Sequence, residues 1–302
     1  MCENKKMLII SDNDLDGTGA IVVAKTAFPY IEYITPERNL LNKAVEDAIL
    51  SDKYDYIFMT DCSISDENTE HIVEEYVSKG NKFILLDHHK SALHLNKYEW
   101  AQVKVETDGL KHCGTELIYK YLLDLGFKMD GLEEFVEMVR SYDTWDWART
   151  NNPVPERLNI LYWNYSDKEK FISDMVIRGI YKLGLMSDRD NAVVDTVKRM
   201  DDKYIEERKT MFTSKTYGKY NVAVLFTDRC VSQLGNIICK ENEDIDFCCL
   251  VDLNRNKVSM RCVKDTVDVS QIAQMFNGGG HSKAAGFVFA DDIKDKVMNL
   301  IF

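Results

Sequence analysis

The sequence lacks several features that define whole classes of protein. No apolar run approaches the ~20 residues that span a bilayer, and residues 1–6 lead into a strand-like run rather than the apolar core of a signal peptide. The eight cysteines include no Cys-x-x-Cys pair, and Cys248 and Cys249 lie in an apolar run. We therefore expect a cytoplasmic protein without a membrane partner, whose cysteines, Cys2 included, are reduced core thiols rather than zinc ligands.

The sequence also has fewer basic than acidic residues. Lys and Arg number 38 against 50 Asp and Glu, which gives a formal net charge of −12. A chain of this charge repels a polyphosphate backbone, so a long nucleic acid is not an expected partner. Proline is scarce, at 4 residues, whereas hydrophobic residues make up 45% of the 302 positions. This composition is typical of a folded globular protein with room for roughly two domains.

The order of strand-like and helix-like segments indicates the fold class. Short, mostly unalternated apolar runs, typical of strands buried on both faces, lie at residues 7–10, 56–59 and 83–86. Helix-like segments lie at residues 20–27, 41–50, 67–78, 115–125 and 132–140. The alternation of strand and helix predicts an α/β fold with a parallel sheet.

A change of composition divides the chain. Residues 187–216 are densely charged with helical spacing and predict a helical connector. The strand-like runs after it lie at residues 222–226, 247–253, 258–263 and 287–290, with helix-like segments near 234–240 and 269–276. We predict a parallel-sheet α/β domain at residues 1–186 and a smaller α/β domain at residues 217–302.

Three carboxylates at alternate positions follow the first predicted strand. Asp12, Asp14 and Asp16 lie just past its carboxyl end, where open α/β sheets bind ligands. This much negative charge in one turn requires a cation. A calcium loop of the EF-hand type would need Glu at its twelfth position, which is Val23, and helices on both sides. We therefore favour a catalytic metal site over a calcium loop or a plain acidic turn.

Two further predicted strands are followed by acidic or histidine side chains. Asp61 follows the second, and Asp87-His88-His89 ends the third. Because parallel strands present their carboxyl ends at one edge of a sheet, we expect these side chains to converge with the acidic turn. Carboxylates mixed with imidazoles suit Mn²⁺ or a similar divalent ion, and a bridging carboxylate is typical of a two-metal hydrolytic centre.

These residues resemble a known family along nearly the whole chain. Asp87-His88-His89 is the name-giving triplet of the DHH phosphoesterases. Residues 12–17 resemble the first motif of the family in its RecJ-type form, Asp61 stands where the second motif has its Asp, and Asp143 resembles the fourth motif. The segments that are similar to the associated DHHA1 domain lie at residues 258–261, 267–269 and 278–287.

The resemblance implies a role for each acidic position. It implies that Asp14 and Asp16 bind separate Mn²⁺ ions and that Asp61 bridges them. His88 and Asp143 then complete the shell of the second ion. Some family members have a His upstream of the first motif, and we expect Asp12 to take its place. Asp146 follows the same predicted helix as Asp143, so the fourth-motif ligand stays open between the two, with Asp143 favoured.

The resemblance also implies substrate contacts. His89 is similar to the family residue that contacts the scissile phosphate, and Asp87 to a partner that orients the imidazoles. In the second domain, Arg261 offers a bidentate fork to a phosphate. The neighbouring glycine-rich stretch, in which a backbone without side chains can approach an anion closely, consists of Gly278, Gly279, Gly280 and His281.

Together these features predict a Mn²⁺-dependent phosphodiesterase or exonuclease. The compact size resembles nano-RNases and 3′-phosphoadenosine-5′-phosphate phosphatases, which implies hydrolysis of short oligonucleotides or small nucleotides by two-metal catalysis. Mg²⁺ or another divalent ion is an alternative cofactor. A cyclic dinucleotide phosphodiesterase and a non-catalytic nucleotide-binding sensor are alternative functions. Family members often form homodimers, and the sequence leaves the oligomeric state, the RNA or DNA preference and the pathway open.

Overall fold

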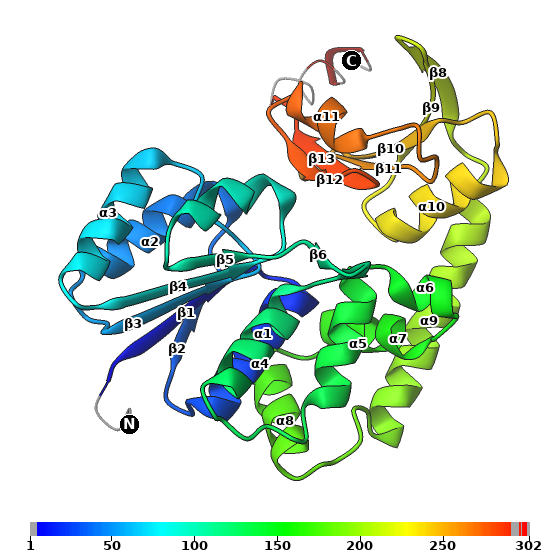
Figure 1. The fold of residues 1–302 in the computed structure, drawn as a ribbon. Coiled ribbons are helices and arrows are strands. Elements are labelled where there is room, and N and C mark those ends of the chain that lie inside the picture. The colour runs from blue at the N-terminus through cyan, green and yellow to red at the C-terminus, as the bar shows by residue number, and fades with distance from the viewer. Residues whose placement is uncertain (1–4, 291–295, 297, 301–302) are drawn as a thin grey trace. The chain divides into compact units, whose positions relative to one another are not determined.

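The chain divides into two compact units. The structure is a computed structural model that describes residues 5–290, 296 and 298–300. Its units are Met1–Asp195 and Thr196–Phe302, and helix α9 (Asp188–Arg208) spans their boundary (Figure 1). Helix α9 lies within the predicted connector, and the predicted domain bounds stay predictions. No helix in the described part of the chain combines the length and the apolar character needed to cross a membrane.

The N-terminal unit is built on a parallel sheet, as the sequence predicts. Five strands lie in the order β2-β1-β3-β4-β5, and every neighbouring pair is parallel. Their bounds are β1 (Met7–Ser11), β2 (Glu32–Ile34), β3 (Tyr56–Thr60), β4 (Lys82–Asp87) and β5 (Ala101–Val103). Because β2 and β3 lie on opposite sides of β1, the strand order reverses between β1 and β3.

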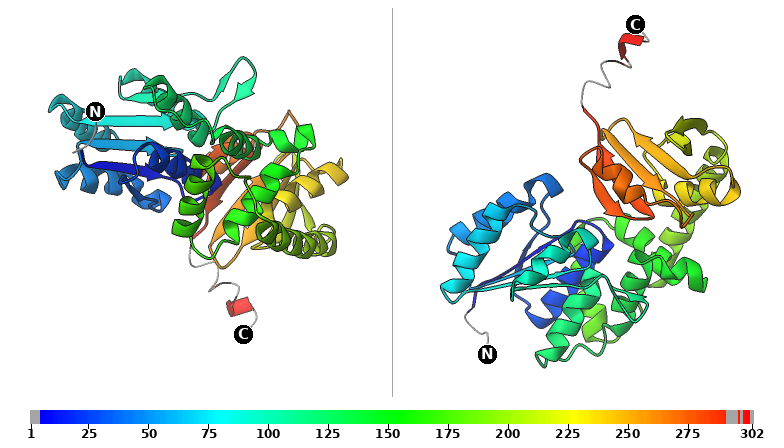
Figure 2. Two further views of the ribbon diagram at one scale, coloured as in Figure 1. Left: turned by 90° about the horizontal axis from the view of Figure 1, so that it is seen from below. Right: turned by 45° about the horizontal axis from the view of Figure 1, so that its top comes forward.

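Helices cover both faces of this sheet (Figures 1 and 2). One face carries α2 (Leu41–Leu50) and α3 (Glu67–Ser78), and the other carries α1 (Leu15–Ala27) and α4 (Gly114–Asp124). Alternate strand residues face the two sides: Ile57 belongs to the buried cluster under α2 and α3, whereas Ile9 and Phe58 are buried outside that cluster. The strands are therefore buried on both faces, which explains why their sequences do not alternate.

Helix α1 differs from its prediction in a way that matters for function. It begins at Leu15 rather than at residue 20, because Asp14 caps it and accepts a hydrogen bond from the Gly17 N–H at 3.0 Å. Asp16 therefore lies in the first turn of a helix rather than in a loop. Helices α2 and α3 coincide with the predicted segments 41–50 and 67–78.

The rest of the N-terminal unit is mainly helical. Helix α5 (Glu133–Asp143) continues three residues past its predicted end at residue 140 and so includes Asp143. The remaining elements, which the sequence patterns did not predict, are η1 (Arg38–Leu40), η2 (Lys90–Lys97), β6 (Glu106–Thr107), β7 (Leu110–Lys111), α6 (Asp146–Thr150), α7 (Val154–Trp163) and α8 (Lys168–Ile180).

The C-terminal unit contains a second sheet with helices, which confirms the predicted second α/β region. In the described part of this unit, six strands lie in the order β12-β13-β11-β10-β9-β8, and among them only β9 and β10 pair in parallel. The elements are β8 (Thr213–Tyr217), β9 (Tyr220–Phe226), α10 (Val231–Glu241), β10 (Phe247–Asp252), β11 (Lys257–Arg261), α11 (Val269–Gln274), β12 (Gly279–His281) and β13 (Ala284–Val288).

The cysteines serve packing rather than cross-linking. All seven within the described residues are free, and Cys113, Cys239, Cys248 and Cys262 are buried. Among those residues, the side-chain groups that could hold a metal ion include no cysteine. Cys2 lies outside the described residues.

Candidate metal centre

The acidic and histidine side chains gather at one edge of the parallel sheet. Asp12, Asp14 and Asp16 follow β1, Asp61 follows β3, and the triplet beginning with Asp87 ends β4. These are neighbouring strands, and the order of the sheet reverses between β1 and β3. A reversal of this kind leaves a crevice at the carboxyl ends of the strands, because the flanking connections run to opposite sides. The topology therefore brings distant parts of the chain to one place.

Asp16 is held by the start of helix α4. Its two carboxylate oxygens accept hydrogen bonds from the Gly114 N–H at 2.7 Å and the Thr115 N–H at 2.8 Å. The helix N-terminus stabilises this negative charge, although the side chain is only 2% exposed. A Cβ on Gly114 would lie 2.6 Å from the Cβ of Asp61, so this close approach requires glycine. The sequence patterns assign no role to Gly114 or Thr115. The feature that could have identified these two residues is the run of small residues at the start of the predicted helix.

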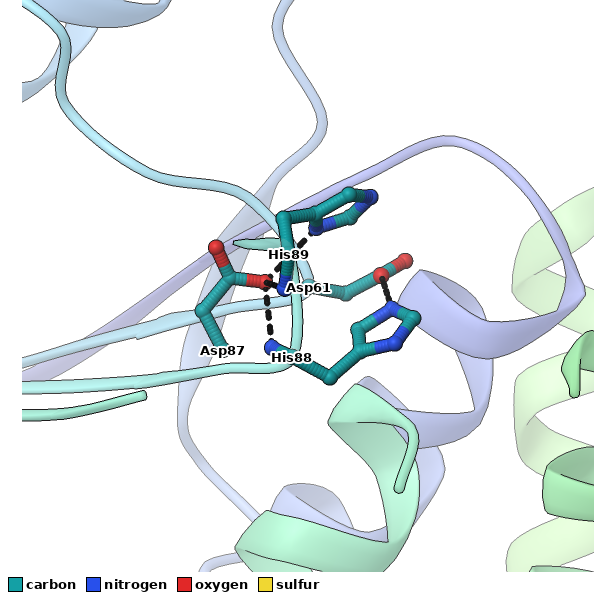
Figure 3. A group of neighbouring side chains, drawn as sticks. All are labelled: Asp61, Asp87, His88 and His89. Carbon is teal, nitrogen blue, oxygen red and sulfur yellow. Dashed lines mark hydrogen bonds and ion pairs between the residues drawn. The ribbon is translucent and has the colours of Figure 1, made fainter. Parts of the chain in front are cut away.

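His88 lies at the centre of the carboxylates. Its Nε2 is 3.1 Å from Asp61 Oδ1 and 3.7 Å from Asp16 Oδ2, and its Nδ1 is 3.6 Å from Asp143 Oδ2. One ligand atom from each of Asp16, His88 and Asp143 lies within 4.8 Å of the others. The same holds for a second group, which consists of Asp61, Asp87, His88 and His89 (Figure 3). His88 thus belongs to both groups.

The charges in this cluster are unbalanced. Burial raises the pKa of Asp61 well above its ordinary value, and the charges of Asp16 and Asp14 raise it further. Burial together with Asp12 and Asp16 raises the pKa of Asp14 to about 7. The pKa of Asp143 rises to about 6, chiefly through burial, although His88 opposes the rise. Such repulsion is what a divalent cation offsets, and oxygen ligands with an imidazole fit Mn²⁺ or Mg²⁺.

The backbone at Asp61 is strained. Its φ is +56°, in the left-handed region that residues other than glycine rarely adopt. Asp tolerates this region better than most residues, because its short side chain bonds locally. Strain of this kind persists where the surrounding structure holds it, often at functional sites. Here the turn directs the carboxylate toward His88, while the Asp61 N–H donates to the Leu86 carbonyl at 3.3 Å.

Asp87 organises the histidines rather than the carboxylate cluster. It is fully buried, and its Oδ1 accepts hydrogen bonds from the His88 N–H at 2.7 Å and the His89 N–H at 3.3 Å. The same oxygen lies 2.7 Å from His89 Nδ1, and the Ser63 hydroxyl bonds to Oδ2 (Figure 3). Burial alone would lower the pKa of His89, but Asp87 outweighs it and raises that pKa to about 9. His89 is therefore a cation at neutral pH.

The structure separates Asp143 from Asp146. Asp143 approaches His88, whereas Asp146 accepts from Arg140 at 2.9 Å and from Arg149 at 3.3 Å. Asp146 is thus engaged in ion pairs with two arginines, and Asp143 is the residue placed for an ion. Its role as a ligand stays a prediction, as do the ligand roles of Asp12, Asp14, Asp16, Asp61 and His88. Asp12 is exposed beside this cluster.

The predicted substrate residues of the C-terminal unit lie on neighbouring strands. Ala284 of β13 pairs with Arg261 on one side and with His281 on the other. The Arg261 guanidinium donates to the Ser232 hydroxyl at 2.8 Å and to its neighbouring Met260 carbonyl at 2.9 Å. The glycines are not a loose turn: Gly279 and Gly280 pair with β13, and a Cβ on Gly278 would collide with its backbone. Phosphate binding by Arg261, Gly278, Gly279, Gly280 and His281 stays a prediction.

Comparisons with known proteins agree with this geometry. The family described as "DHH family, N-terminal domain" matches residues 6–141. Oligoribonuclease NrnB of Bacillus subtilis is 36% identical in an alignment of 294 residues that covers 94% of this chain and 73% of that protein. A 3′,5′-cyclic-nucleotide phosphodiesterase of Helicobacter pylori is 24% identical and covers 92% of this chain, which spans 91% of it. RecJ of Thermus thermophilus, solved with Mn²⁺, shares the fold at a TM-score of 0.58 and 13% identity; it covers 98% of this chain, which spans 51% of it.

Proposed function

This chain belongs to the DHH family of phosphoesterases, and from that premise we propose that it hydrolyses short oligoribonucleotides with two divalent cations. The observation that carries the proposal is the cluster around His88, where the carboxylates of Asp16, Asp61 and Asp143 converge. The substrate class is supported by the oligoribonuclease of Bacillus subtilis, which resembles this chain along 94% of its length. A net charge of −12 also favours short substrates over long strands.

The proposed ligands divide between two ions. We propose that Asp14, with Asp12 beside it, holds one ion and that Asp16, His88 and Asp143 hold the other. Asp61 would serve both ions, because its carboxylate lies 3.1 Å from His88 Nε2 and the charges of Asp16 and Asp14 both raise its pKa, after burial. Paired Mn²⁺ or Mg²⁺ ions supply activation of water and stabilisation of the leaving oxygen when bound. The strained turn at Asp61 and the N-terminus of α4 preorganise these carboxylates before substrate arrives.

His89 and Asp87 have a separate proposed task. His89 is cationic at neutral pH, and its Nδ1 faces Asp87, so its Nε2 edge points away from the carboxylate (Figure 3). An imidazolium N–H in this position donates to a non-bridging oxygen of the scissile phosphate and stabilises its developing charge. Asp87 orients the ring and keeps the proton on it. In the C-terminal unit, Arg261, Gly278, Gly279, Gly280 and His281 are proposed to bind a phosphate of the substrate.

The test is a substrate panel with product analysis. Diribonucleotides to pentaribonucleotides, a long single strand, 3′-phosphoadenosine-5′-phosphate, a cyclic dinucleotide and a 3′,5′-cyclic mononucleotide are incubated with Mn²⁺, with Mg²⁺ and with chelator. We expect mononucleotides to be released fastest from the shortest RNAs, and the reaction to stop with chelator. Hydrolysis that continues unchanged without a divalent ion would contradict the metal assignment, and preference for the long strand would contradict the substrate class.

A second candidate function is hydrolysis of cyclic nucleotides. The cyclic-nucleotide phosphodiesterase of Helicobacter pylori favours it, because the two chains cover more than nine-tenths of each other. Cyclic and linear phosphodiesters are both cleaved by attack on phosphorus, so the metal centre by itself does not separate them. Exclusive cleavage of a cyclic substrate in the panel would establish this function instead. Tight binding without any hydrolysis would establish a nucleotide sensor.

A further inference from the structure

A small hollow lies beside the candidate metal centre. Its volume is about 150 Å³, and Asp12, Asp61 and His89 form part of its wall. Ser63, after β3, and Arg38 also line it. A volume this small is below the ~300 Å³ at which pockets begin to enclose a drug-sized molecule. The hollow therefore has room for a small group such as a phosphoryl group, and not for a whole nucleoside.

Arg38 brings a permanent positive charge to this wall. It begins the short helix η1, directly before α2, and its side chain is exposed. Within the described residues it forms no ion pair or hydrogen bond. Other arginines of the chain pair with carboxylates, namely Arg140, Arg149, Arg157, Arg178, Arg229 and Arg255. An arginine without a partner, beside a cluster rich in carboxylates, has its fork available for an external anion.

Two neighbouring groups respond to the charge of Arg38. Burial raises the pKa of the Cys62 thiol, Asp87 and Asp12 raise it further, and the Arg38 charge lowers it. Burial and Asp87 chiefly determine the pKa of His89, and the Arg38 charge lowers it as well. Both effects arise from the charge of the Arg38 guanidinium. They agree with its position in the wall of the hollow.

We propose that Arg38 binds a non-bridging oxygen of the scissile phosphate in this hollow, together with His89. The inference rests on the proposed phosphodiesterase function and adds a residue outside the motifs described above. A planar guanidinium presents two parallel N–H donors that match two phosphate oxygens. Arg38 then provides positive charge in a wall that also holds the carboxylates of Asp12 and Asp61.

The test compares Arg38→Ala and Arg38→Lys with Lys43→Ala. Lys43 is exposed on α2 and outside the wall of the hollow, so it controls for loss of surface charge. With a diribonucleotide and Mn²⁺, we expect kcat/KM of Arg38→Ala to fall roughly ten- to hundredfold, the usual cost of a charge-assisted hydrogen bond. Arg38→Lys should retain part of the rate, since a lysine keeps the charge without the fork. The inhibition constant of inorganic phosphate should rise most in Arg38→Ala and less in Arg38→Lys.

Two outcomes separate this inference from the proposed function. If wild type hydrolyses the diribonucleotide and Arg38→Ala matches Lys43→Ala within about twofold in rate and in phosphate inhibition, Arg38 is a solvated surface residue and the inference is wrong. If wild type hydrolyses nothing in the panel, the proposed function fails, and phosphate binding is measured by calorimetry on the Mg²⁺-loaded protein. Weaker phosphate binding by Arg38→Ala than by Lys43→Ala then supports the inference, and equal binding overturns it. Circular dichroism and melting temperature check that each variant is folded.

Discussion

The interaction between Asp87 and His89 can be tested quantitatively by replacing one carboxylate oxygen of Asp87 with an amide nitrogen. Asp87→Asn keeps the shape of a side chain that is fully buried, and the amide oxygen can still accept from the backbone N–H groups of His88 and His89. What disappears is the negative charge that holds a proton on His89. In the metal-free protein, we therefore expect the pKa of His89 to fall from about 9 toward its ordinary value of 6.5.

The size of the effect follows from linkage between protonation and folding. The pKa of His89 is higher in the folded than in the unfolded protein, so its stabilisation is fully present below pH 6.5 and is lost as pH rises through about 9. The difference corresponds to about 3 kcal/mol, as an upper value, because the His89 side chain is 24% exposed and solvent weakens the pair. The stability advantage of wild type over Asp87→Asn should shrink by up to this amount between pH 6.5 and pH 10.

Two assays measure these quantities in the presence of chelator. Carbon-13 NMR of labelled histidine gives the pKa of His89, whose resonance is assigned by its absence in His89→Gln. Exposed His71 on α3 lies outside the site, and its resonance serves as an internal reference that the substitution should leave unchanged. Urea unfolding between pH 6.5 and pH 10 gives the stability difference. A His89 that titrates near 6.5 in wild type, or at the same pH in Asp87→Asn, would refute the reasoning.

Three further predictions concern the metal centre. Asp61→Asn should lower turnover at least about a hundredfold, because a metal ligand is lost; initial rates measure this. The metal-free variant should be more stable than wild type, since one of several buried like charges is removed; urea unfolding with chelator measures the difference. Asp143→Asn should abolish activity with little change in melting temperature, whereas Asp146→Asn should cost about 1–3 kcal/mol of stability, because it removes a partner of the buried Arg140. Gly114→Ala should destabilise the protein by about 1–3 kcal/mol and weaken Mn²⁺ binding, measured by calorimetry, since its Cβ would meet Asp61 at 2.6 Å.

Each of these has a contrary result. An active Asp61→Asn enzyme would remove Asp61 from the ligands. Loss of activity in Asp146→Asn but not in Asp143→Asn would reverse the assignment of the fourth motif. The control for Gly114→Ala is Gly184→Ala, because a Cβ at Gly184 meets nothing within 4 Å. Equal stability of the two alanine variants would show that α4 can move away from Asp61.

Much of the fold could be predicted because local signals agree with the tertiary structure. Helix α3 coincides with the predicted segment 67–78, where Asp66 caps the start and accepts from the Thr69 N–H at 3.1 Å. The predicted start of α1 at residue 20 was wrong, because the sequence of the acidic turn is compatible with a loop and with a capped helix until its packing is known. Strand β2 escaped prediction since it has three residues and lies at a sheet edge, where its burial pattern is weak. Helices α6, α7 and α8 gave no distinct sequence signal that we could use.

The sequence by itself determined the parallel α/β architecture and the residue types at the site. Buried strands need continuous apolar runs, and carboxylates after three such runs must meet at one sheet edge. Only the tertiary structure decided which of Asp143 and Asp146 approaches His88, because that depends on how α5 packs and on the partner that Arg140 takes. The same holds for Arg38, whose position in the wall of the hollow follows from the path of the chain between β2 and α2. Local patterns encode secondary structure, whereas contacts between distant segments depend on the packing of the whole unit.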